Sequence, residues 1–159
     1  MTSPPFRQVH FFKHFFQIRE LALEHVQDYI PTSIVRHLDL SIFELDTTNY
    51  INPELSETRS DVVYRTCLNN GRDLRLALLD EHKSEQPDRD VRFQILTYKN
   101  SIWLEDEKQD RRPTFILPSV IYHGRTNWKK EPFLHSFQGL PASLVRYLDD
   151  FDYLLLNLR

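Results

Sequence analysis

The length and composition of the chain, 159 residues of which 40% are hydrophobic, predict a single globular domain over residues 1–159, with a disordered tail at residues 1–5. Its three glycines nearly exclude a glycine-rich phosphate-binding loop, and its net charge of -3 argues against a strongly basic, non-specific DNA-binding protein. The apolar stretches are far shorter than a membrane span and the single cysteine cannot form an internal disulfide, so we expect a cytoplasmic protein without membrane contact.

Hydrophobic periodicity and turn residues predict helices and strands in a mixed order. In chain order these are a helix at 7–29, a short helix at 32–38, strands at 41–45, 61–68 and 74–83, a helix at 90–105, a charged and solvated loop to 112, a strand at 114–122, a short helix at 141–147 and a strand at 151–158. This order indicates a mixed α/β fold. Six side chains are predicted to lie in the core: Phe12, Phe16, Leu76, Leu78, Ile95 and Ile121.

Residues 61–83 are the informative segment, because their character alternates along two predicted strands. A three-residue turn, Asn69-Asn70-Gly71 with glycine at a left-handed position, pairs residue 68 with residue 72. In this register the apolar even-numbered residues share one face of the hairpin. The sequence therefore predicts that Asp61, Glu81 and Lys83 lie together on the other face.

Two carboxylates and an amine on one face have a specific use in phosphodiester chemistry. Asp61 and Glu81 supply the oxygen ligands that Mg²⁺ prefers, and a lysine at position 83 is placed to position or deprotonate an attacking water. An acidic residue followed on the next strand by Glu-x-Lys is the core of the PD-(D/E)XK nuclease pattern. On this spacing alone, a surface ion pair between Glu81 and Lys83 is the simpler interpretation.

The predicted helix at 90–105 adds a second feature. Gln94 and Tyr98 are four residues apart, so they lie on one face of this helix. A Gln-xxx-Tyr helix directly after the Glu-x-Lys strand resembles the PD-(D/E)XK nucleases of the RecB and phage exonuclease type. This resemblance implies that Gln94 and Tyr98 support the site or contact the substrate. The alternative is an ordinary amphipathic helix with Tyr98 half buried.

Several short motifs along most of the chain resemble one family, the recombination-promoting nucleases and transposases of the Rpn or YhgA-like kind, within the PD-(D/E)XK superfamily. The motifs are Phe11-Phe12-Lys13 with Phe16, Leu38-Asp39-Leu40-Ser41, Arg59-Ser60-Asp61-Val62-Val63-Tyr64, Glu81-His82-Lys83-Ser84, residues 93–103, Leu117-Pro118-Ser119-Val120-Ile121-Tyr122-His123-Gly124, and residues 147–158. The resemblance implies a restriction-endonuclease-like core, in which helices flank a mixed central sheet.

The same resemblance implies an activity and a site. It implies a bacterial, Mg²⁺-dependent DNA endonuclease associated with recombination or transposition, with Mn²⁺ or Ca²⁺ as other metals to test. Asp61 and Glu81 are the implied metal ligands, and the backbone carbonyl of His82 completes the metal shell. Lys83 is the implied positioner of the nucleophile. DNA is the implied partner, together with a second copy of the chain or a longer member of the family.

Three departures from the family pattern keep other interpretations open. Gln8-Val9 stands where the family has His-Asp, Lys83 stands where it has Gln, and family members continue beyond a position like Leu158. The first and third departures favour a catalytically degenerate module that keeps the fold and binds DNA or a partner protein. The intact Glu81-His82-Lys83 motif disfavours that alternative. A nuclease that acts on RNA is a further alternative.

Overall fold

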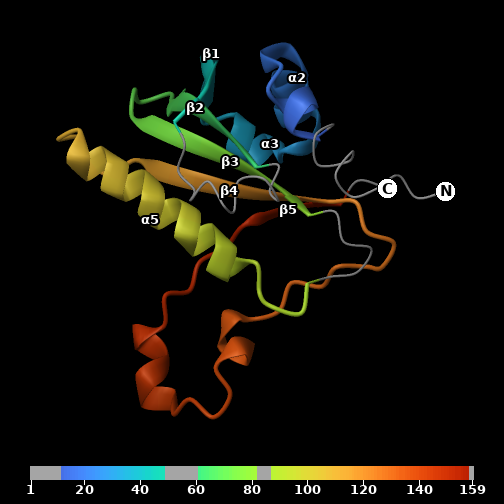
Figure 1. Cartoon of the computed structure of the whole chain (residues 1–159), viewed down its shortest axis with the longest axis vertical. Helices are drawn as coiled ribbons and strands as arrows, with labels where there is room; N and C mark the ends of the chain where they lie inside the picture. Colours follow the sequence, from blue (N-terminus) through green and yellow to red (C-terminus); the bar gives the residue numbers. More distant parts are fainter. Residues whose placement is uncertain (1–11, 49–60, 82–86, 158–159) are drawn as a thin grey trace.

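The protein is built around one five-stranded mixed sheet, seen in a computed structural model that describes residues 12–48, 61–81 and 87–157 (Figure 1). The strands lie side by side in the order of the chain: β1 (Leu38–Leu45), β2 (Val62–Leu68), β3 (Asp73–Glu81), β4 (Phe115–Tyr122) and β5 (Leu154–Asn157). The first three strands are antiparallel, whereas β4 and β5 run parallel to β3. Parallel neighbours need a crossover, and the helix α5 (Arg92–Lys108) supplies the one between β3 and β4.

Helices cover both faces of the sheet and create two hydrophobic clusters. On one face, α2 (Arg19–Tyr29) packs through Ala22 and Val26 against even-numbered residues of β2 and β3. The short helix α3 (Thr32–Val35) follows α2 on this side. On the other face, α5 packs through Ile95 and Ile102 against odd-numbered residues of β2 and β3 and even-numbered residues of β4. The central strands are therefore covered on both faces by helices.

The predicted register of the central hairpin is confirmed. Tyr64 pairs with Leu76, and Cys67 pairs with Asp73. The turn brings Leu68 against Arg72, with the Leu68 N–H donating to the Arg72 carbonyl at 2.8 Å. Gly71 has a φ of 84°, the left-handed conformation that the three-residue turn requires. All six side chains predicted to lie in the core are buried: Phe12, Phe16, Leu76, Leu78, Ile95 and Ile121.

The prediction of one continuous helix to residue 29 is wrong within the described part of that segment. Residues 12–16 are helical, the backbone of Ile18 is extended with a ψ of 111°, and α2 begins at Arg19. The Phe16 carbonyl, which a continuous helix would pair with an N–H one turn later, instead accepts the Tyr64 hydroxyl at 2.5 Å. A buried tyrosine on β2 thus binds the backbone where the helix breaks.

Other element boundaries also differ from the sequence prediction. The short helix ends at Val35 and not at residue 38, because Leu38 and the next residues already pair with β2. Helix α5 continues to Lys108, three residues into the predicted loop. The last strand begins at Leu154 and not at residue 151.

Two short 3-10 helices, η1 (Phe133–Ser136) and η2 (Ala142–Tyr147), lie between β4 and β5. The second of them falls in the segment 141–147 that was predicted to be helical. Both lie in a lobe that hangs away from the sheet, drawn in orange and red at the bottom of Figure 1. Within the described residues, no helix combines the length and the apolar character needed to cross a bilayer.

Candidate active site

Asp61 lies at one end of the central strands, where β3 ends; this end of the sheet is called its edge below. It directly precedes β2, and continuing the hairpin register by one residue places it opposite Leu79 of β3. One carboxylate oxygen of Asp61, Oδ1, accepts the backbone N–H of Asp80 at 3.1 Å. The Asp61 carboxylate therefore lies beside the backbone of the residue that precedes Glu81, on the side of the sheet that α5 covers.

Helix α5 brings both residues of the Gln-xxx-Tyr motif to the same carboxylate. Oδ2 of Asp61 accepts the Tyr98 hydroxyl at 2.5 Å and the Gln94 side-chain amide at 3.2 Å. The two donors reach one oxygen because they are one helical turn apart, while Ile95 of the same helix is packed into the core. Tyr98 is 4% exposed, so the tyrosine is buried and not half buried as the alternative expected.

Glu81 is the last residue of β3 and pairs with Tyr122 at the end of β4. Its carbonyl accepts the backbone N–H of His123 at 3.4 Å, which joins the two parallel strands where they end. Glu81 shares the odd-numbered face with Asp61 and is partly exposed. His82 and Lys83 follow it but lie outside the described residues, as do Gln8 and Val9, so their roles stay predictions.

The ability of these residues to hold a metal ion follows from their donor atoms. Across residues 12–48, 61–81 and 87–157, no cluster of three or more His, Cys, Asp or Glu side chains is arranged to hold a metal. Asp61 and Glu81 offer carboxylate oxygens, the hard ligands that Mg²⁺ prefers, and Mg²⁺ commonly binds proteins through one or two carboxylates plus waters and substrate phosphate. The donor atoms of Asp61 and Glu81 are therefore of the kind that Mg²⁺ takes.

Asp80 and His123 form a feature of this edge that the sequence analysis missed. The Asp80 side chain is fully buried on the even-numbered face, and its Oδ1 lies 3.4 Å from Nε2 of His123. The ring of Phe12 packs edge-on against His123 at 6.2 Å between ring centroids. The Tyr122-His123-Gly124 motif was the sequence signal for this contact. Reasoning about single strands did not pair His123 with Asp80.

Steric crowding explains why position 124 of the same motif is a glycine. A side chain at this position would overlap the ring of Tyr122, which is fully buried. The Tyr122 hydroxyl contacts the Thr126 hydroxyl at 3.0 Å, and its ring packs against Trp128. Gly124 thus lets the chain turn closely over Tyr122 at the end of β4.

The fold and this edge define the class of protein. A mixed five-stranded sheet with helices on both faces is an α/β architecture consistent with a restriction-endonuclease-like core. The chain belongs to the family described as "Putative transposase, YhgA-like", whose pattern matches residues 9–159. This agrees with the resemblance seen in the sequence motifs.

A curated relative from Escherichia coli (strain K12), "Inactive recombination-promoting nuclease-like protein RpnE", is 26% identical over 153 residues. The match covers 95% of this chain and 46% of RpnE, so the chain spans about half the length of that relative. No solved structure matches the chain. The family is therefore a transposase and nuclease-like one, and the relative carries a name that marks it as inactive.

Proposed function

We propose that this protein is a metal-dependent DNA endonuclease that hydrolyses phosphodiester bonds in recombination or transposition in the cytoplasm. The observation that carries the proposal is the convergence of Tyr98 and Gln94 on the Asp61 carboxylate. The sequence placed all three residues in a nuclease pattern from separate segments. Their contact in the fold supports the proposal, because it joins the Gln-xxx-Tyr helix to the acidic residue of that pattern.

The residues of the site have separable tasks in this proposal. Asp61 and Glu81 would hold Mg²⁺, which when bound lowers the pKa of a water and offsets charge on the phosphate. Tyr98, Gln94 and the Asp80 N–H fix the orientation of the Asp61 carboxylate. Lys83 would position or deprotonate the attacking water, and the carbonyl of His82 would complete the ligand set.

A second candidate function is a catalytically degenerate module that binds DNA or a partner protein. The name of the E. coli relative, which calls that protein inactive, favours it. So does Gln8-Val9 in place of the His-Asp of the family pattern. In this alternative the Asp61 cluster keeps a structural role, since Tyr98 and Gln94 still join α5 to the sheet.

A plasmid-nicking assay separates the two functions. We expect the wild-type protein to nick supercoiled DNA with Mg²⁺ or Mn²⁺ and not with EDTA. Asp61→Asn and Glu81→Gln remove ligand charge with little change of shape and should abolish nicking. Asp73→Asn, at the exposed opposite end of β3, is the matched control and should keep full activity.

A binding measurement gives a readout that does not depend on cleavage. Mg²⁺ should raise the melting temperature of the wild-type protein, because an ion that binds the folded state stabilises it. Glu81→Gln should lose that increase and Asp73→Asn should keep it. Wild-type protein that binds DNA but never nicks it with any divalent metal would establish the degenerate module instead.

A further inference from the structure

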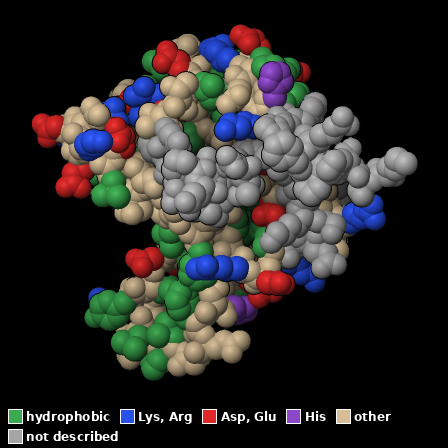
Figure 2. All heavy atoms as spheres, in the orientation of Figure 1, with side chains coloured by type: hydrophobic (Ala, Val, Ile, Leu, Met, Phe, Trp, Pro, Cys, Tyr) green, Lys and Arg blue, Asp and Glu red, His purple; other side chains and the backbone are tan. Residues whose placement is uncertain are grey.

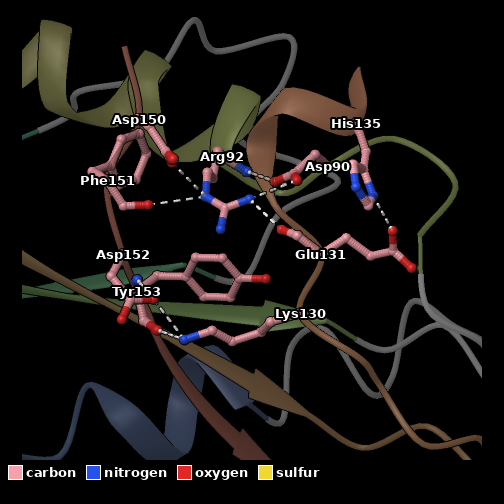
Figure 3. Close-up of polar contacts among 9 residues, drawn as sticks. All are labelled: Asp90, Arg92, Lys130, Glu131, His135, Asp150, Phe151, Asp152 and Tyr153. Carbon is pink, nitrogen blue, oxygen red and sulfur yellow. Dashed lines mark hydrogen bonds and ion pairs between the residues drawn. The ribbon is translucent and has the colours of Figure 1, made fainter. Parts of the chain in front are cut away.

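The lobe formed by residues 131–151 is held rigidly to the body at its two ends. The guanidinium of Arg92 on α5 donates to the Glu131 carbonyl at 3.0 Å, to the Phe151 carbonyl at 2.9 Å and to the Asp90 carboxylate at 2.8 Å (Figure 3). Beside it, Lys130 donates to the Asp152 carboxylate at 2.6 Å. One buried arginine thus binds the start and the end of the lobe, so the lobe is presented in a fixed orientation.

The lobe exposes several large hydrophobic side chains. Helix η2 has no buried residue, and three of its six side chains are large hydrophobics: Leu144, Val145 and Tyr147. Tyr147 is 72% exposed. Figure 2 shows hydrophobic side chains gathered at the far end of the lobe. Large exposed hydrophobic side chains that gather in one place are a common feature of interaction sites.

The same lobe also contains a hollow that suits a tyrosine. An open hollow of about 560 Å³ lies over η1, with Leu134, Phe137 and Leu140 among its lining residues and Glu131 and His135 also lining it. Nδ1 of His135 and the carboxylate of Glu131 lie 2.7 Å apart. Hollows of roughly 300–1,000 Å³ hold whole small molecules, so a phenol ring fits. A buried tyrosine also needs a polar partner for its hydroxyl, and the Glu131–His135 pair places polar atoms at the rim of the hollow.

We propose that the occupant of this hollow is Tyr147 of a second copy of the chain, in a symmetric dimer. The protruding ring and the hollow lie on the same lobe, and a twofold interface is built from one patch that complements itself. The charges agree, because Arg146, whose guanidinium lies over the Tyr147 ring, would approach Glu131 of the other copy. Residues 131–151 carry three acids, Glu131, Asp149 and Asp150, against one arginine, Arg146, and this excess of negative charge opposes a phosphate backbone as the occupant.

Sedimentation equilibrium without DNA or metal tests this dimer independently of the proposed nuclease activity. The wild-type protein should dimerise reversibly, and Tyr147→Ala should weaken dimerisation about 30-fold, as expected for a central aromatic contact. Tyr29→Ala is the matched control, because Tyr29 is also a largely exposed tyrosine (53%) and lies outside the lobe, on α2. It should dimerise like the wild type.

Charge reversal identifies the partner surface. Arg146→Glu and Glu131→Arg should each weaken dimerisation, and the double variant should recover it, since the exchanged charges again face each other. This pair also serves if Tyr147→Ala fails to fold. Wild-type protein that stays monomeric at millimolar concentration would overturn the proposal, as would equal losses in Tyr147→Ala and Tyr29→Ala or a double variant without recovery.

Discussion

The hydrogen bond between Tyr98 and Asp61 should be measurable as a coupling between two substitutions. Tyr98→Phe removes only the hydroxyl and leaves the ring packed beside Ile95 and Ile102. The lost bond is a 2.5 Å contact between a hydroxyl and a carboxylate on a tyrosine that is almost fully buried. Hydrogen bonds to charged groups contribute about 1.5–3 kcal/mol, so we expect the free energy of unfolding to fall by that amount.

Asp61→Asn replaces the charged acceptor with a neutral one. When Asp61→Asn is already present, Tyr98→Phe should cost only about 0.5–1.5 kcal/mol, the range for a neutral hydrogen bond. The double-mutant cycle should therefore give a coupling of about 1–1.5 kcal/mol. Urea unfolding of the four proteins in EDTA measures it, because EDTA removes any contribution of bound metal.

Tyr122→Phe is the control for this cycle. Its hydroxyl is also buried but contacts the neutral Thr126 hydroxyl, so Tyr122→Phe should not couple to Asp61→Asn. A Tyr98–Asp61 coupling below about 0.5 kcal/mol, or one no larger than the Tyr122 control, would refute the idea that Tyr98 fixes the candidate ligand. The proposed function would then lose the observation that carries it.

Further predictions concern stability, pH and catalysis. Leu78→Ala should destabilise the fold by ~2–5 kcal/mol in urea, since Leu78 is fully buried between the sheet and α2, and a loss below about 1 kcal/mol would contradict this packing. Burial, with His123 adding and Asp28 opposing, lowers the pKa of His25 from 6.5 to about 4. The unfolded chain therefore takes up a proton below about pH 6.5 that the folded chain takes up only near pH 4, so stability should fall as the pH drops through this window. His25→Phe should flatten that part of the stability curve measured by urea unfolding, and an unchanged slope would show that His25 is not its cause. Gly124→Ala should lower the melting temperature because its methyl group collides with the Tyr122 ring, and an unchanged value would refute the close packing. Lys83→Met should keep the Mg²⁺-induced rise in melting temperature and lose about 10²–10⁴-fold in nicking rate, whereas a full rate would remove Lys83 from the mechanism.

The hairpin and the α5 contacts were predictable from sequence because local rules determine them. Alternation assigned each residue of β2 and β3 to a face, and the turn with Gly71 fixed the register. Once the register was known, the faces of Asp61 and Glu81 followed. The four-residue spacing of Gln94 and Tyr98 then indicated which side of α5 turns toward them.

The features that the sequence did not reveal depend on contacts between distant segments. The helix break at Ile18 coincides with a hydrogen bond from Tyr64, 48 positions from Phe16. Asp106 belongs to a charged stretch that predicts a solvated loop, yet it is 1% exposed and its carboxylate accepts the Thr114 N–H at 2.9 Å. Arg111 also pairs with this carboxylate at 3.3 Å. Composition alone cannot distinguish a buried charged residue in the last turn of a helix from a charged residue in solvent.

The Arg92 anchor has a consequence for how the connection between β4 and β5 can change over time. Arg92 binds the backbone of Glu131 and Phe151, and so holds together the two ends of the segment between them. That segment is therefore a closed loop. The entropy cost of closing a flexible loop grows only with the logarithm of its length, so doubling the loop costs only about 0.6 kcal/mol. Insertions or deletions beyond the anchor that keep the buried Phe133 in place should therefore leave the sheet and its acidic edge almost unchanged. The lobe can therefore be remodelled for a new partner at a small cost in stability.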